Sequence, residues 1–220
     1  MPKPSSKSAA KSPAQPKLPA EWSAAEPLFA DEEEWWQLDL DGDAFTGEVT
    51  GLEIEQSRLT RVRLNDARLT KGSLLDCVLT QCDLANLHAD ECGWRRSELV
   101  ECRGTGLVFI DGVVKDVTLR ECRLDLTTWR ATTFTTVVFK DCDLRRADFV
   151  GADLRGAVFD GCDLSGAQFS NAKAEGTRIL GCDLTGLGGV ASLAGATVRA
   201  DDLQALTELL AEALGIVVER

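Results

Sequence analysis

The chain has 220 residues, enough for one large domain, and its 36 acidic and 24 basic residues give a formal net charge of −12. This balance argues against a general binder of nucleic acid or anionic membranes, which needs a surplus of lysine and arginine. A hydrophobic content of 44% excludes wholesale disorder, and a single His with no Tyr leaves little for acid–base or metal chemistry.

Residues 1–20 are rich in proline, serine and alanine, and they carry four lysines and no acid. They contain no apolar run typical of a secretory signal peptide, and no stretch of the chain approaches the ~18 apolar residues of a membrane helix. We expect a disordered basic tail over 1–20, with contact to nucleic acid or to an acidic partner as the lesser alternative.

Residues 21–46 reverse the sign of the charge. Nine acids and no base lie between positions 21 and 44, together with Trp22, Phe29, Trp35 and Trp36. Acids mixed with aromatic residues favour a short ordered segment over a free tail. We therefore predict an acidic and aromatic N-terminal cap over 21–46.

A five-residue repeat runs through most of the chain. From Val49 to Leu184, 25 of the 28 positions spaced five apart hold a large apolar side chain. A second, mostly small series lies two positions earlier and includes all eight cysteines, six of which are spaced twenty apart from Cys82 to Cys182. A period of five fits neither a helix nor a strand, so it is the repeat unit itself, and four repeats are expected to close one turn.

The run ADFVG ADLRG AVFDG CDLSG AQFSN over 147–171 resembles the pentapeptide-repeat family, whose pattern is A-(D/N)-L-x-x. The resemblance covers 47–186, although RLTRV RLNDA RLTKG over 58–72 lacks the Asp or Asn before the central residue. It implies an all-β solenoid: a right-handed, four-sided β-helix of about seven coils, with the central residue and the small residue pointing inward. A solenoid of this kind buries one continuous core.

The inward positions define a predicted structural core and a use for the cysteines. Phe109, Trp129, Phe149 and Phe169 are expected to form an aromatic ladder on one side. The cysteines lack the short C-x₂₋₄-C spacing of zinc sites, and stacked neighbours are too far apart for disulfides, so we expect buried, reduced thiols in a reducing cytoplasm, with no metal or cofactor. The core residues singled out are Leu144, Phe149, Leu154, Phe159, Leu164, Phe169, Cys142 and Cys162.

The repeat loses its register after Leu184, and we predict a degenerate last coil over 187–200. Residues 201–220 are expected to form a helix and tail, with Asp201 as N-cap and Gly215 after the C-terminus. The helix caps the solenoid in one interpretation. In related pentapeptide-repeat proteins such a helix joins two solenoids end to end, so we also predict a homodimer. Its candidate interface is Leu203, Leu206, Leu210 and Leu214.

No catalytic motif stands out, and we predict that the protein is not an enzyme. His88 occupies an outward position and is interpreted as a solvated surface residue, and GxxxxGK[ST] and GxSxG motifs are absent from the sequence. The favoured function is a rigid protein-interaction scaffold with an unknown partner, without direct binding of nucleic acid or membrane. Its candidate partner surface is Val108, Ile110, Val138 and Val158.

The resemblance implies an alternative function. Some members of the family mimic DNA, bind type II topoisomerase (gyrase) and protect it from inhibitors such as quinolones. Such mimicry needs a long stripe of negative potential, but 47–186 contains 22 acidic and 18 basic residues, interspersed. This distribution favours the scaffold.

Overall fold

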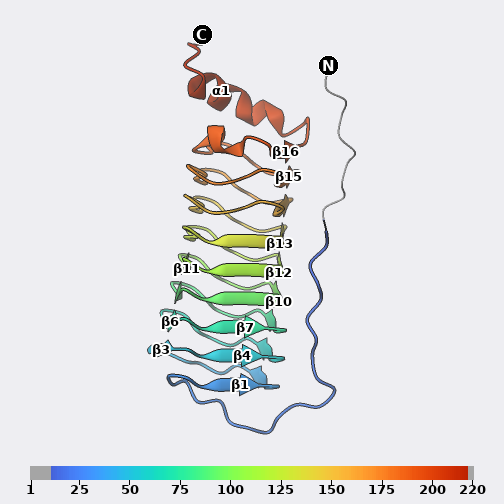
Figure 1. Cartoon of the computed structure of the whole chain (residues 1–220), viewed down its shortest axis with the longest axis vertical. Coiled ribbons are helices and arrows are strands. Elements are labelled where there is room, and N and C mark those ends of the chain that lie inside the picture. Colours follow the sequence, from blue (N-terminus) through green and yellow to red (C-terminus); the bar gives the residue numbers. More distant parts are fainter. Residues whose placement is uncertain (1–10, 218–220) are drawn as a thin grey trace.

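The computed structural model describes residues 11–217. The chain winds into a parallel β-solenoid of about eight turns, with one helix, α1 (Leu203–Ala213), across its C-terminal end (Figure 1). Successive coils lie in register at a spacing of 20 residues, as in the pairing of Trp94 with Val114. The predicted fold class is confirmed.

Each coil has four sides, which we call faces A, B, C and D in chain order. Face A carries a four-stranded sheet whose strands each cover one repeat: β3 (Glu48–Thr50), β6 (Arg68–Thr70), β9 (His88–Asp90) and β11 (Val108–Ile110). Face D has no named strand in the described residues and is held by single bridges such as Arg63–Asp83 and Asp143–Asp163.

Faces B and C share a twelve-stranded sheet. The strands of face B alone are β1 (Glu34–Trp36), β4 (Glu53–Glu55) and β7 (Ser73–Leu75). Those of face C alone are β2 (Asp39–Asp41), β5 (Arg58–Thr60), β8 (Val78–Thr80), β14 (Val158–Asp160), β15 (Arg178–Leu180) and β16 (Thr197–Val198). Three longer strands cross both faces: β10 (Gly93–Val100), β12 (Val113–Arg120) and β13 (Thr133–Lys140).

The solenoid begins earlier than the boundary expected at residue 47. Strands β1 and β2 already pair with β4 and β5, at a spacing of 19 residues in place of 20. The aromatic rings of Phe29, Trp35 and Phe45 close the bore beneath them, with ring centroids of Trp35 and Phe45 4.6 Å apart. The acidic segment therefore supplies one more coil, which accounts for about eight turns where seven were predicted.

The core is one continuous column of inward side chains. All eight core residues singled out from the sequence are buried, with at most 2% of the surface of each exposed. The face A aromatic ladder is interrupted: Phe109 contacts Trp129 and Phe149 stacks on Phe169, but Trp129 turns toward Phe134 and Phe139. Its indole N–H donates to Thr127 Oγ1 at 2.9 Å, which orients the ring away from the ladder.

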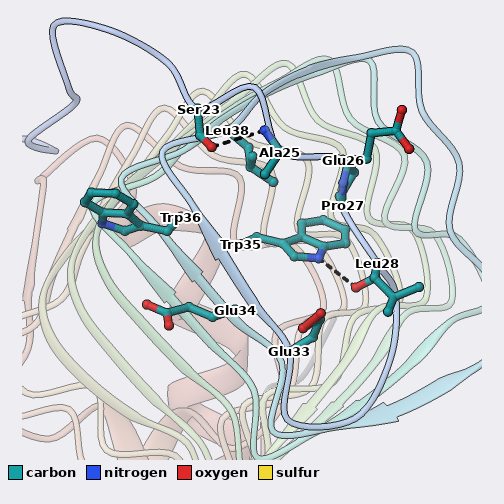
Figure 2. A pocket seen from close by; sticks show the side chains of 10 residues that line it. All are labelled: Ser23, Ala25, Glu26, Pro27, Leu28, Glu33, Glu34, Trp35, Trp36 and Leu38. Carbon is teal, nitrogen blue, oxygen red and sulfur yellow. Dashed lines mark hydrogen bonds between the residues drawn. The ribbon is translucent and has the colours of Figure 1, made fainter.

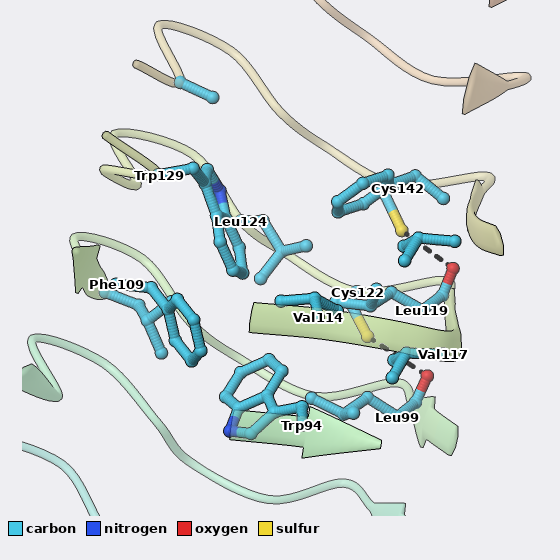
Figure 3. Close-up of a cluster of buried hydrophobic side chains, with 14 of the residues drawn as sticks. Trp94, Leu99, Phe109, Val114, Val117, Leu119, Cys122, Leu124, Trp129 and Cys142 are labelled. Carbon is cyan, nitrogen blue, oxygen red and sulfur yellow. Dashed lines mark hydrogen bonds between the residues drawn. The ribbon is translucent and has the colours of Figure 1, made fainter. Parts of the chain in front are cut away.

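The six cysteines spaced twenty apart lie in one column at the corner between faces C and D. All eight cysteines are buried and free. Each thiol of the column donates to a carbonyl of the preceding coil, as Cys122 does to Leu99 and Cys142 to Leu119 at 3.5 and 3.4 Å (Figure 3). The thiols are therefore more than small apolar fillers, because each adds a hydrogen bond to a buried carbonyl of the preceding coil.

Two segments outside the repeats also differ from expectation. Residues 11–20 contain no helix or strand but lie along the outside of the solenoid (Figure 1), whereas a disordered tail was expected over 1–20. The Lys17 N–H donates to Asp76 Oδ1 at 3.1 Å, which fixes this segment to the coils. Residues 1–10 lie outside the described residues.

At the C-terminal end, a 3₁₀ turn, η1 (Val190–Leu193), and β16 form the last coil within 187–200. The N-cap of α1 is Asp202 and not Asp201. Its carboxylate does not cap the helix but accepts the Gly181 N–H at 2.7 Å, so the acid ties the helix to the corner of an earlier coil.

Candidate interaction surfaces

The valine and isoleucine residues proposed as a partner surface divide between two opposite faces. Val108 and Ile110 lie on β11 in face A, whereas Val138 and Val158 pair in register on β13 and β14 in face C. All four are half-buried. They therefore cannot form one surface, because a four-sided solenoid places faces A and C back to back.

The face A pair has an exposed neighbour that the sequence analysis missed. Val113 begins β12 just past the corner between faces A and B, and 37% of it is exposed. Beside it a shallow groove of about 310 Å³ crosses three coils, and Gly93, which has open space where a side chain would begin, leaves part of it unfilled. The signal was an apolar residue in an outward position next to glycine.

A second exposed apolar residue lies at the corner between faces D and A. Leu126 is 51% exposed and has a left-handed backbone, φ 60°, which is unusual for a bulky residue. It borders a hollow that is otherwise polar, lined by Asp125, Arg145, Arg146 and Ser165.

A smaller hollow, of about 190 Å³, lies at the N-terminal end (Figure 2). Glu26, Glu33 and Glu34 line it together with the half-exposed Trp36. Trp35 is held beneath, because its indole N–H donates to the Leu28 carbonyl at 2.9 Å (Figure 2). The acids suit a cationic group, but no buried side-chain nitrogen or oxygen in residues 11–217 lacks a hydrogen-bond partner.

Charges on the coils are paired across neighbours. Arg96 donates to Asp76 through Nε and Nη2 at 2.9 and 2.6 Å, and Arg103 contacts Asp83 at 3.0 Å. Both pairs span 20 residues, one coil. This pairing breaks any long stripe of a single sign.

The longest row of acidic residues follows the corner between faces C and D and continues onto face D. Glu101, Glu121 and Asp141 follow one another there at exposed positions, and Asp143 and Asp163 continue the acids on face D. Arg145 lies among them and contacts both Asp143 at 2.6 Å and Asp163 at 3.8 Å.

His88 and the buried cysteines are the residues that the sequence analysis considered for acid–base or metal chemistry. His88 is half-buried on β9 with its Nδ1 3.5 Å from Arg68 Nη1. Burial raises the pKa of the Cys77 thiol to about 12 and that of Cys92 to about 11, so both stay protonated at neutral pH. Within residues 11–217, no group of three His, Cys, Asp or Glu is placed to hold a metal ion.

Helix α1 presents two neighbouring leucine stripes. Leu206 is buried against the end of the solenoid, and Leu209 packs partly against the same core. Leu206 therefore belongs to the cap and not to the dimer interface expected from the sequence. Leu203, Leu210 and Leu214 face outward and are 46%, 37% and 75% exposed.

Comparison with known proteins settles the family. A model described as the pentapeptide repeat region matches residues 72–149 and 114–188, which together span more than half of the chain. The chain belongs to the pentapeptide-repeat family. This family is a structural repeat fold. No curated protein matches the chain. In residues 11–217 no helix is long and apolar enough to cross a membrane.

Solved pentapeptide-repeat structures resemble the chain at low identity. A trypsin-treated form of QnrB1, a plasmid-mediated fluoroquinolone resistance protein, is 19% identical over 87% of this chain and 97% of that one, with a TM-score of 0.41. HetL, involved in heterocyst differentiation regulation in the cyanobacterium Nostoc sp. strain PCC 7120, is 18% identical over 76% and 87%, with a TM-score of 0.34. Likenesses this distant carry no argument about function.

Proposed function

We propose that this protein is a non-enzymatic interaction scaffold, assembled as a homodimer through helix α1. The observation that carries the proposal is the outward leucine stripe of Leu203, Leu210 and Leu214, which remains exposed after Leu206 and Leu209 have capped the solenoid. Ile216 and Val217 extend it, at 56% and 87% exposed. A second copy offers a self-complementary apolar surface, as an isologous interface requires.

Light scattering on the intact protein tests the dimer. We expect a dimer of the 23.8 kDa chain, which Leu210→Glu converts to a monomer. Gln204→Glu, on the same helix but at a polar exposed position, is the matched control and should remain dimeric. A wild-type monomer at tens of micromolar overturns the dimer and leaves the helix as a cap only.

The lateral surface proposed for a protein partner is Ile110 and Val113 beside the glycine groove. The half-buried Ile110 and the exposed Val113, next to the groove at Gly93, offer more accessible apolar surface than Val138 and Val158, which are both half-buried and lie side by side in register on face C. Partner retention by immobilised protein should fall with Val113→Lys and persist with Val138→Lys. The opposite result moves the partner to face C. Because the buried thiols are reduced, we place the scaffold in a reducing cytoplasm.

Binding of type II topoisomerase by DNA mimicry is a second candidate. The acids Glu101, Glu121, Asp141, Asp143 and Asp163 favour it, whereas the pairing of Arg145 with two of them weakens the negative potential. Supercoiling assays with gyrase, with and without a quinolone, test it. Protection that Glu121→Lys removes would support mimicry, and no effect at micromolar protein would exclude it.

A further inference from the structure

Residues 11–23, which we call the strap, climb the outside of the solenoid along the corner between faces B and C. Ser23 N–H donates to the Gln37 carbonyl at 2.7 Å, Trp22 lies 4.8 Å from the Arg58 guanidinium, and Lys17 contacts Asp76. These partners belong to successive coils. The strap therefore runs opposite to the rise of the solenoid (Figure 1).

Every third residue of the strap is partly buried against the solenoid. Between residues 11 and 20 only Pro13, Pro16 and Pro19 are half-buried, and every other residue is exposed. A period of three is that of a polyproline II helix, which rises ~3.1 Å per residue and so ~9.3 Å between these prolines. Two coils stacked ~4.8 Å apart rise ~9.6 Å, so the spacing of the prolines matches every second coil.

Asp76 anchors the strap at a corner that differs from the others in its coil. Asp76 is 1% exposed, whereas Lys71 and Gln81, at the two adjoining corners, are exposed. Its carboxylate accepts both Arg96 bonds and the Lys17 N–H. Burial alone would raise the pKa of Asp76, but these hydrogen bonds and the charges of Arg96 and Lys17 hold it below the ordinary value.

Nothing integrates the strap into the fold beyond these contacts. It adds no strand to a sheet and packs no helix, and its lysine and leucine side chains point to solvent, with Leu18 38% exposed. The strap is held only through three half-buried prolines, one contact between an aromatic ring and a guanidinium, and two hydrogen bonds of backbone N–H groups. Another segment of the same pattern could make these contacts in its place. Polyproline segments suit this use, because their conformation is formed before binding and little entropy is lost.

We propose that the corner between faces B and C is a binding site for extended segments with proline at every third position and a free backbone N–H next to a proline, and that the strap is its resident ligand. A partner with the same pattern competes with the strap for Asp76 and the proline contacts. The site refines the scaffold function proposed above by naming a class of partner. It does not depend on dimerisation or on the glycine groove.

The test uses full-length protein and a fluorescent peptide with the sequence of residues 11–23. Replacing Pro13, Pro16 and Pro19 by Ser loosens the strap, and this variant should bind the peptide at least about tenfold more tightly than wild type, because the competing segment is removed. Adding Asp76→Asn should weaken binding about tenfold, since Asn keeps the left-handed backbone but loses the charge-assisted bonds. The matched control replaces the exposed residues Ala14, Gln15 and Leu18 by Ser, and it should behave as wild type.

Two results overturn the site. One is a loosened variant that binds the peptide no better than wild type, and the other is binding that Asp76→Asn leaves unchanged. Glu91→Gln, at an exposed acid of another corner, must have no effect. If Asp76→Asn does not fold, hydrogen exchange on wild type decides: a protected Lys17 amide supports the site, and exchange at the rate of a free peptide overturns it. Peptide binding can fail while light scattering still gives a dimer, which separates this proposal from the scaffold.

Discussion

The N-terminal and C-terminal coils build the same solenoid by different means. Between Gln56 and Glu101 all ten corner residues with positive φ are not glycine, whereas between Gly151 and Gly186 seven of eight are glycine. The early coils are tied by ion pairs that span a coil, such as Arg58–Asp39 and Arg96–Asp76. In the late coils Arg145–Asp143 and Arg155–Asp153 lie within one repeat, although Arg130–Asp148 still joins neighbouring coils.

Bonds within a repeat are more frequent in the late coils. There several Asp residues that precede a central residue accept the N–H two residues later, as Asp163 does from Ser165 at 3.0 Å, and the early coils have such a bond at Asp83. The Ala152 N–H donates to the Phe149 carbonyl at 3.0 Å, a corner bond that the early coils also form, from Ala67 to Leu64 at 3.2 Å. Many late repeats therefore hold their own corner. The early coils depend on their neighbours and on the strap, which indicates that they are the part of the solenoid more sensitive to changes in contacts between coils.

The largest expected effect comes from removing an aromatic rung of the late coils. Phe149 is fully buried and stacks on Phe169 at 5.1 Å, so Phe149→Ala should lower the free energy of unfolding by about 3–5 kcal/mol. Leu69→Ala, at the same face of an early coil but half-buried, should cost less. Urea unfolding followed by circular dichroism measures both. Equal losses would mean that core packing does not distinguish the two regions.

The cysteine column crosses both regions and should respond alike in each. Cys142→Leu is expected to overpack the bore and cost about 1–3 kcal/mol. Cys142→Ala should cost up to about 1 kcal/mol, because the buried Leu119 carbonyl loses the hydrogen bond from the thiol, and Cys142→Ser should restore most of this loss. Thermal melts of the three variants, repeated with reductant and with a zinc chelator, measure the effect. A wild-type melting temperature that either reagent lowers would contradict the assignment of the thiols to packing and hydrogen bonding.

Substitutions at corner residues with positive φ test whether glycine and non-glycine corners differ in stability. Gly156 has φ 80° and open space around its missing side chain, so Gly156→Ala should cost about 1 kcal/mol from the backbone alone. Leu126, at φ 60°, occupies the same kind of corner, and Leu126→Gly should be neutral or slightly stabilising. Guanidinium midpoints compare the two. Gly156→Ala without cost would show that glycine in the late corners serves another purpose.

Sequence reasoning reached the fold because the repeat places one large and one small residue inward in every five, and this pattern needs no distant contact to be recognised. It placed Phe149 and Cys142 in the core for the same reason. It missed the strap, since Pro13, Pro16 and Pro19 acquire meaning only beside coils whose spacing they match. It could not separate Leu206 from Leu203 and Leu210, because the helical period marks an apolar stripe but not which part of it the last coil covers. Val113 and Leu126 were missed because outward apolar residues are common on strands and corners.

Acid should release the strap before it unfolds the coils. The pKa of Asp76 is lowered in the folded chain, so its contribution is present above the ordinary carboxyl pKa and is lost as pH falls through the lowered value. Arg96 and Lys17 are the charged groups whose interactions lower this pKa, and the hydrogen bond to Asp76 raises the pKa of Arg96 further above its ordinary value. Hydrogen exchange over residues 14–20 should therefore rise below about pH 4. In Asp76→Asn the exchange should be fast and insensitive to pH over this range, and a wild-type profile in that variant would contradict the assignment.

The smallest expected effects distinguish ion pairs between coils from those within a repeat. Arg58 donates to Asp39 and also lies against Trp22, so Arg58→Ala removes one contact between coils and one contact of the strap. Because the Arg58 side chain is 44% exposed, solvent screening limits the loss to less than about 1 kcal/mol. Arg155→Ala removes a pair within one repeat, where Asp153 still accepts the backbone N–H at 3.3 Å, and should cost less. Double-mutant cycles with Asp39→Ala and Asp153→Ala, at low and at 0.5 M salt, give the two coupling energies. We expect a larger and more salt-sensitive coupling energy for Arg58–Asp39 than for Arg155–Asp153. Arg58→Ala should also give faster hydrogen exchange in the strap. A larger coupling energy for Arg155–Asp153 would contradict the difference between the two regions.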